Sequence, residues 1–99
     1  MAGIKPILPG KILEQEFLIP MGISSYKLAK DIKISLTRVS EILKGKRRIT
    51  VDTALRLSKY FGNSAEFWVG IQADYEIRKA KKDLKTQLDG IQRLKTTIA

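Results

Sequence analysis

Apolar residues recur at helical spacing in the middle of the chain, in two short segments that follow each other directly. In residues 24–33 the apolar positions Leu28, Ala29 and Ile32 fall on one side of a helix. In residues 35–44 the matching positions are Leu36, Val39, Ile42 and Leu43. Each segment is therefore predicted to be a short helix that buries one stripe of side chains.

Polar residues mark the ends of these two helices. Ser24 and Ser35 are predicted caps, because a serine hydroxyl accepts a hydrogen bond from a free amide in the first helical turn. Gly45 is expected to end the second helix. Two helices joined so closely, with the small Ala29 where they cross, are typical of a helix-turn-helix. Lys33 lies in the turn, where a left-handed backbone would cost a lysine about 1 kcal/mol. We expect this turn either to avoid positive φ or to be slightly strained.

A preceding helix is predicted to begin at Pro9, because a proline in the first turn loses no hydrogen bond. Its apolar stripe is Ile12, Leu13 and Phe17, and it is expected to end before Pro20. Residues 1–8 show no periodic pattern and are expected to form a loose arm.

A fourth helix is predicted over residues 51–61, capped by Thr50 and ended by Gly62. Its stripe is Val51, Ala54, Leu55, Ser58 and Phe61. A fifth helix follows the cap Ser64, and four large side chains share one side of it. They are Phe67, Trp68, Ile71 and Tyr75. Such a stripe is typical of a core or a subunit interface, and we predict that these residues form a dimer interface.

The last part of the chain, residues 77–99, has a weaker pattern. Ile77, Leu84, Ile91 and Ile98 repeat every seven residues. Gly90 interrupts the repeat and costs about 1 kcal/mol inside a helix. We expect a helix to about residue 86 and fraying beyond it.

Composition limits the possible functions. A chain of 99 residues, 43 % of them apolar, makes a single domain. It has no apolar run near the roughly eighteen residues of a membrane helix and no signal peptide, so a cytoplasmic protein is expected. Without His or Cys it lacks the usual general base, the thiolate nucleophile and most transition-metal ligands. The sequence therefore predicts no enzyme, no cofactor, no metal site and no membrane contact.

The net charge of +9 is unevenly distributed. Residues 24–50 hold eight basic and two acidic residues, a net of +6, and residues 76–99 add +4. A basic excess on a two-helix motif predicts binding to double-stranded DNA.

The predicted DNA contacts fall into two groups. The exposed side of the second helix would read base edges in the major groove. Its candidate base contacts are Ser35, Thr37, Arg38, Ser40, Glu41 and Lys44. Arg38 is the best candidate for a contact to guanine, and a phosphate contact is the alternative role for its side chain. The candidate phosphate contacts are Ser24, Ser25, Tyr26, Lys27, Lys46, Arg47, Arg48 and Thr50.

Short motifs spread over residues 8–80 resemble one family. They are PGKIL at 9–13, EFL at 16–18, GKR at 45–47, DTALRL at 52–57, FG at 61–62, SAEFW at 64–68 and QADY at 72–75. In order and spacing these resemble the HigA/VapI antitoxins, within the Xre class of lambda-repressor-like helix-turn-helix proteins. The resemblance implies an all-α fold: a five-helix lambda-repressor-like core over residues 8–76, with a C-terminal helical extension over 77–99.

The resemblance also implies a double function in a type II toxin-antitoxin module. The protein would repress its own operon as a homodimer on a palindromic operator, and would neutralise a HigB-like, mRNA-cleaving toxin. The residues by themselves favour only DNA binding. Two alternatives stay open: a free-standing Xre-type regulator without a toxin, and a basic RNA-binding module. The second would normally place aromatic side chains on its binding face, and here Tyr26 is the only aromatic among the basic residues.

Overall fold

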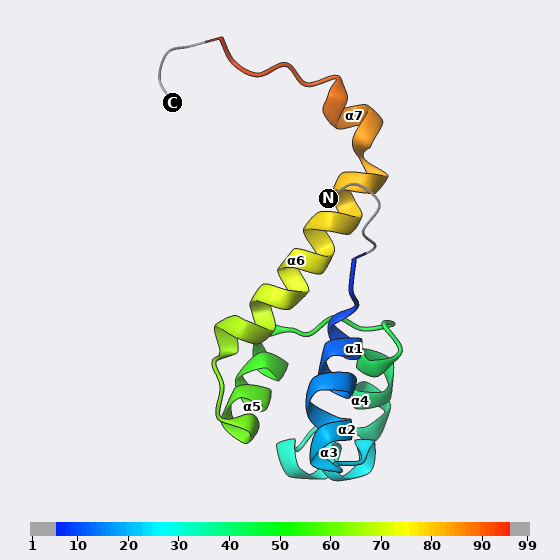
Figure 1. Ribbon diagram of the computed structural model, residues 1–99, viewed down its shortest axis with the longest axis vertical. Helices are drawn as coiled ribbons and strands as arrows, with labels where there is room; N and C mark the ends of the chain where they lie inside the picture. Colours follow the sequence, from blue (N-terminus) through cyan, green and yellow to red (C-terminus); the bar gives the residue numbers. More distant parts are fainter. Residues whose placement is uncertain (1–5, 96–99) are drawn as a thin grey trace.

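The computed structural model describes residues 6–95, and all regular structure in this range is helical. The helices are α1 (Pro9–Leu13), η1 (Glu14–Leu18), α2 (Ile19–Met21), α3 (Ser25–Ile32), α4 (Leu36–Leu43), α5 (Val51–Phe61), α6 (Ala65–Asp83) and α7 (Lys85–Asp89). Because α1, η1 and α2 follow without a break, they form one helix, and α3 to α6 supply the other four of the predicted five (Figure 1). The all-α prediction is confirmed. Most of the predicted N-terminal arm, residues 1–5, and Ile98 lie outside the described residues.

All four predicted caps form. In each, the side-chain oxygen accepts a hydrogen bond from the backbone amide three residues further on. The capping residues are Ser24, Ser35, Thr50 and Ser64. Gly45 and Gly62, which follow α4 and α5, have φ values of 77° and 78°, as a left-handed helix end requires. The local signals for helix ends are therefore confirmed.

The first helix does not end before Pro20, which corrects the prediction. The Ile19 amide donates to the carbonyl oxygen of Glu14, five residues back, so the helix is widened over η1. Pro20 then lies at the start of the α-helical stretch α2, and it donates no backbone hydrogen bond to the preceding turn. The helix continues to Met21 and ends at Gly22.

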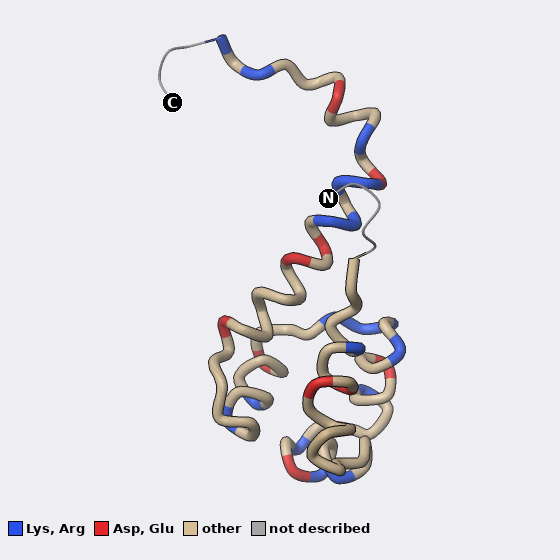
Figure 2. Tube along the Cα trace, viewed as in Figure 1, with Lys and Arg blue, Asp and Glu red and all other residues tan. Residues whose placement is uncertain are grey.

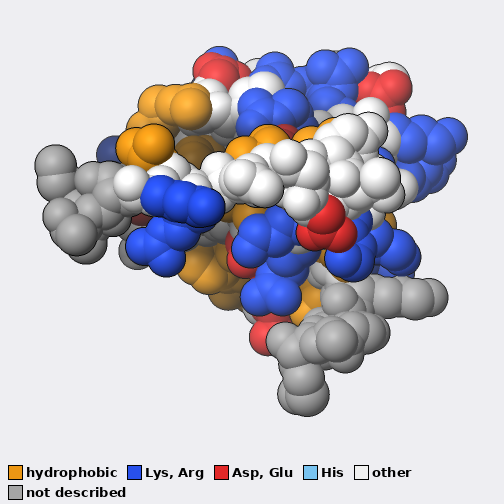
Figure 3. Space-filling view, turned by 90° about the horizontal axis from the view of Figure 1, so that it is seen from above, with side chains coloured by type: hydrophobic (Ala, Val, Ile, Leu, Met, Phe, Trp, Pro, Cys, Tyr) orange, Lys and Arg blue, Asp and Glu red, His pale blue; other side chains and the backbone are white. Residues whose placement is uncertain are grey.

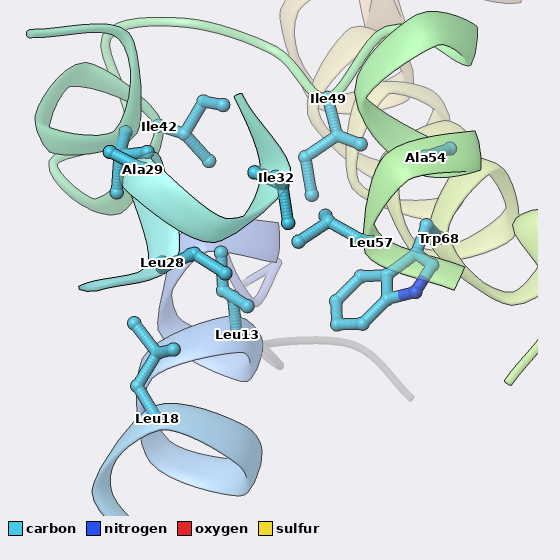
Figure 4. Close-up of a cluster of buried hydrophobic side chains, with 11 residues drawn as sticks. Leu13, Leu18, Leu28, Ala29, Ile32, Ile42, Ile49, Ala54, Leu57 and Trp68 are labelled. Atoms are coloured by element: carbon cyan, nitrogen blue, oxygen red, sulfur yellow. The ribbon is translucent and has the colours of Figure 1, made fainter. Parts of the chain in front are cut away.

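The core receives apolar side chains from every helix of the body (Figure 4). Its members are Leu13, Leu18, Leu28, Ala29, Ile32, Val39, Ile42, Ile49, Ala54, Leu57 and Trp68. Three residues assigned to buried stripes are exposed instead: Leu36 at 48 %, Val51 at 63 % and Leu55 at 56 %. On α5 the buried side passes through Thr53, Ala54 and Leu57, because that side faces α3 and α6.

Trp68 lies in the core, not on the surface. Its side chain is 0 % exposed, its ring centroid lies 4.8 Å from that of Phe17, and its Nε1 donates to Asn63 Oδ1 at 2.9 Å. A side chain fully enclosed by its own chain cannot contact a second copy. The placement of Trp68 in the dimer interface is therefore wrong.

Two helices approach each other closely at Gly10, where α1 meets α4. A Cβ atom on Gly10 would lie 2.1 Å from the carbonyl oxygen of Ile42, so only glycine fits. Ala29, expected at the α3–α4 crossing, is indeed buried.

Beyond the body, α6 projects outward and gives the molecule a length of 53 Å against 27 and 22 Å in the other directions (Figure 1). It ends at Asp83, and the short α7 reaches Asp89, so helix extends slightly past the predicted limit of residue 86. In residues 6–95 no helix is both long enough and apolar enough to cross a membrane.

Candidate nucleic-acid interface

The helix-turn-helix consists of α3, a short turn and α4. Lys33, directly after α3, has φ 62° and ψ 47°, so the turn takes the left-handed conformation that lysine resists. Of the two expected outcomes, the strained turn is the one observed. Packing fixes this backbone conformation, because Ile32 and Val39, on either side of the turn, are both buried.

The exposed side of α4 gathers most of the predicted base contacts. One shallow depression is lined by Leu36, Thr37, Ser40, Glu41, Lys44 and Lys46. Leu36 was not a predicted contact, yet its exposed side chain lies beside Thr37 and offers an apolar surface for a thymine methyl group. Ser35 serves as the cap of α4, with its Oγ 3.1 Å from the amide of Arg38. The periodicity of α4 did not reveal Leu36, because an apolar residue in a stripe is normally assigned to the core.

Arg38 does not point outward with these residues. Its Nη2 donates to Thr53 Oγ1 at 2.8 Å, Thr50 Oγ1 at 3.3 Å and Asp52 Oδ2 at 3.3 Å, and its side chain is only 28 % exposed. The structure thus contradicts the outward placement of Arg38. Its guanidinium finds three oxygen acceptors at the start of α5, twelve to fifteen residues away in sequence, and ties α4 to α5.

The start of α3 places Ser24, Ser25, Tyr26 and Lys27 together at a helix N-terminus, where backbone amides can bind a phosphate. Tyr26 is 67 % exposed. Lys27 Nζ lies 2.8 Å from Asp31 Oδ2, and this hydrogen bond raises the pKa of Lys27.

A second depression links this site to the first helix. This depression is lined by Leu8, Lys11, Glu14, Ser25, Ser40, Leu43 and Lys44. Lys11 was not predicted as a phosphate contact, because it lies far from the helix-turn-helix in sequence. Its exposed ammonium group nevertheless shares a surface with Ser25 and Ser40.

The loop between α4 and α5 carries the densest positive charge of the body (Figure 2). Lys46 is exposed, Arg47 Nη2 lies 2.9 Å from Glu41 Oε1, and Arg48 Nε lies 2.8 Å from Glu76 Oε2. These ion pairs are partly exposed, with arginine side chains at 48 % and 57 %, so water weakens them. Phosphate groups can therefore replace the carboxylates. Viewed along the long axis, Lys and Arg form much of the surface, with apolar side chains between them (Figure 3).

The remaining residues of the predicted dimer interface lie along one side of α6. Phe67 is 38 % exposed, while Ile71 and Tyr75 are half-buried. Phe67 and Ile71 form one wall of an apolar groove whose other wall includes Ile12 and Phe17.

Known proteins resemble this chain in both sequence and structure. A sequence model described as helix-turn-helix matches residues 15–68. Virulence-associated protein I of Dichelobacter nodosus is 47 % identical over 77 residues, which cover 78 % of this chain and 71 % of that protein. An addiction module antidote protein of a HigA family from Coxiella burnetii has a solved structure with a TM-score of 0.87 at 40 % identity, covering 92 % of this chain and 100 % of that one. The Pseudomonas aeruginosa antitoxin HigA, solved with the higBA promoter, has a TM-score of 0.88 at 38 % identity, covering 91 % and 99 %.

Proposed function

Because the chain belongs to the HigA family of helix-turn-helix antitoxins, we propose that it has two functions. It binds and represses the promoter of its own operon. It also neutralises a HigB-like, mRNA-cleaving toxin. The observation that carries the DNA-binding half is the depression on α4, which Leu36, Thr37 and Ser40 line together with the cations Lys44 and Lys46. This is a mixed apolar and polar surface of the kind that reads base edges. The proposed role is therefore binding and not catalysis. A protein that binds its own promoter would lie in the cytoplasm.

Two groups of phosphate contacts would hold α4 in the major groove. The start of α3, with Ser24 to Lys27, would meet the backbone on one side. The loop with Lys46, Arg47 and Arg48, followed by Thr50, would meet it on the other. Such contacts fix the register of the protein without reading the sequence. The proposed base contacts are Ser35 and the residues that line the α4 depression, which include Glu41. Arg38 is no longer among them.

A homodimer would give this short reading surface useful specificity. Two copies related by a twofold axis would read a palindromic operator with half-sites about 34 Å apart, or a multiple of that distance. Phe67, Ile71 and Tyr75 are the proposed interface, because Phe67 and Ile71 line an apolar groove with Ile12 and Phe17 that a second copy can cover, and Tyr75 lies one turn further along α6. Sedimentation at micromolar concentration would test this, and a monomer would contradict it.

The toxin-binding half rests on family membership. Two surfaces are candidates: the first helix, where Glu14 and Glu16 could face a basic ribonuclease, and residues 77–99. Co-purification with the product of the neighbouring gene would test toxin binding. If nothing co-purifies while the protein still shifts its promoter in a gel, the chain is a free-standing regulator. If it prefers RNA to duplex DNA, the DNA-binding proposal is wrong.

Arg47→Ala tests the phosphate contacts directly. We expect weaker binding to the promoter and to random duplex DNA alike, with a salt dependence shallower by about one unit, because one phosphate contact is lost. The matched control is Lys59→Ala, which removes one positive charge from α5 outside the proposed interface. Fluorescence anisotropy over a salt series measures both variants. Equal losses for the two would show that only net charge matters.

A further inference from the structure

A buried amide side chain on α6 is bonded to the basic loop after α4. Gln72 is 5 % exposed, and its Oε1 accepts a hydrogen bond from the Ile49 amide at 2.8 Å. Its Nε2 donates to Glu76 Oε2 at 3.0 Å. A buried polar group needs such partners, and a buried amide without them is costly. Gln72 therefore fixes the backbone of the loop at Ile49, although 23 residues separate the two.

Glu76, one turn further along α6, holds the neighbouring side chain of the loop. Its two carboxylate oxygens accept from Arg48, Oε2 from Nε at 2.8 Å and Oε1 from Nη2 at 3.3 Å. This two-point contact lowers the pKa of Glu76 and raises that of Arg48. A guanidinium group binds carboxylate and phosphate in the same forked geometry. A phosphate can therefore make the same two-point contact with Arg48.

We propose that Gln72 is a positioning residue for DNA binding, and that Glu76 holds Arg48 in the free protein and yields it to a phosphate on binding DNA. This inference rests on the proposed function. The contact lines a cleft between the loop, the start of α1 and α6, and both side chains are partly exposed, so a phosphate can approach Arg48 from solvent. With side chains 57 % and 43 % exposed, the ion pair is weak enough to exchange.

The role of Glu76 is tested by comparing Glu76→Gln with Asp74→Asn. Both remove one negative charge from α6, but Asp74 pairs with Arg78 of the same helix and touches no residue of the loop. On a random-sequence DNA duplex, we expect Glu76→Gln to bind up to about fivefold more tightly than Asp74→Asn, because Arg48 no longer has to leave a carboxylate. In an Arg48→Ala background this advantage should disappear. Equal binding by the two variants, or an advantage that persists without Arg48, would overturn the proposal.

The role of Gln72 is tested in the free protein and on DNA. In the wild-type chain we expect the Ile49 amide to exchange slowly with deuterium, as measured by NMR, and fast exchange would overturn the proposal without any variant. In a folded Gln72→Leu variant, exchange at Ile49 should accelerate. Random-duplex binding should weaken at least about tenfold, the loss expected for one charge-assisted contact, and the salt dependence should become shallower by about one unit. Accelerated exchange with unchanged DNA binding would show a purely structural role for Gln72.

These results separate the inference from its premise. If the wild-type chain binds no duplex DNA, the proposed function and this inference both fail. If the wild-type chain binds DNA but Glu76→Gln behaves as Asp74→Asn does, only the inference fails.

Discussion

The body of the molecule, residues 6–76, and the segment beyond it, residues 77–95, carry apolar side chains at similar spacing but bury them very differently. In the body, Leu13, Leu57 and Trp68 are at most 1 % exposed. In the outer segment every residue is exposed, with Ile77 at 55 % and Ile91 at 70 %. The same periodicity thus produces a core in one region and an open helix face in the other.

The two regions differ in burial because only the body offers a second surface on which α6 can pack. The first half of α6 packs on α5 and α1, so its apolar side is covered. The second half extends past them (Figure 1) and keeps its helical form through local hydrogen bonds and ion pairs such as Arg78–Asp74. A repeat of apolar residues therefore predicts burial only where another element lies alongside.

The largest predicted effect compares the two regions directly. Trp68→Ala should lower the free energy of unfolding by about 3–5 kcal/mol, because it leaves a cavity in a closed core. Ile77→Ala should change it by less than about 0.5 kcal/mol, because its side chain is already in water. Urea unfolding at low protein concentration measures both. A large loss for Ile77→Ala would mean that the outer segment is covered by another molecule in solution.

The second prediction compares two glycines within helices. Gly10→Ala should destabilise by about 1–3 kcal/mol, because its Cβ would lie 2.1 Å from the Ile42 carbonyl oxygen and force α1 away from α4. Gly70→Ala should instead stabilise by about 0.5–1 kcal/mol, since nothing lies within 4 Å of the added Cβ in α6. Thermal unfolding of both variants gives the two signs. The same sign for both would contradict the close contact between α1 and α4.

Local chemistry explains what could be predicted from the sequence. The capping residues Ser24, Ser35, Thr50 and Ser64 depend only on the amides three residues further on, and all four were identified. The exposed side of α4 follows from helix geometry in the same way. Most residues that line the α4 depression were therefore among the predicted base contacts, including Thr37, Ser40 and Lys44.

The errors arise where distant segments meet. Arg38 was placed outward because its acceptors, Thr50 and Thr53, belong to another helix. The contacts of Gln72 with Ile49 and of Glu76 with Arg48 span more than twenty residues, and no spacing rule indicates them. Leu36 was assigned to the core because a stripe pattern does not show where the opposing helix ends.

The third prediction concerns the strained turn of the body. Lys33→Gly should stabilise the protein by about 1 kcal/mol, because glycine adopts φ 62° without the steric cost that lysine carries. Lys30→Gly removes the same charge from inside α3 and should destabilise by about 1 kcal/mol, since its backbone is helical. Chemical denaturation distinguishes the two. A loss of stability for Lys33→Gly would show that the turn has a different backbone conformation in solution.

The smallest predicted effect uses two similar ion pairs, one in each region. The distance from lysine Nζ to aspartate Oδ2 is 2.8 Å for Lys27–Asp31 in α3 and 2.9 Å for Lys85–Asp89 in α7. Asp31 also accepts a hydrogen bond from Tyr60 of α5. The bonds from Lys27 and Tyr60 lower the pKa of Asp31 in the folded state. The unfolded chain therefore binds the proton more readily, so this contribution to stability is complete above about pH 4 and is lost as the pH falls through the lowered pKa.

Asp31→Asn should accordingly flatten the decline in unfolding free energy below about pH 4, although Glu76, whose pKa is also lowered, preserves part of it. Asp89→Asn should leave the decline unchanged, because every residue of α7 is exposed. Urea titrations at several pH values measure both variants. If Asp89→Asn flattened the curve as much as Asp31→Asn, the outer segment would share the cooperative unfolding of the body, and the contrast between the two regions would be one of exposure alone.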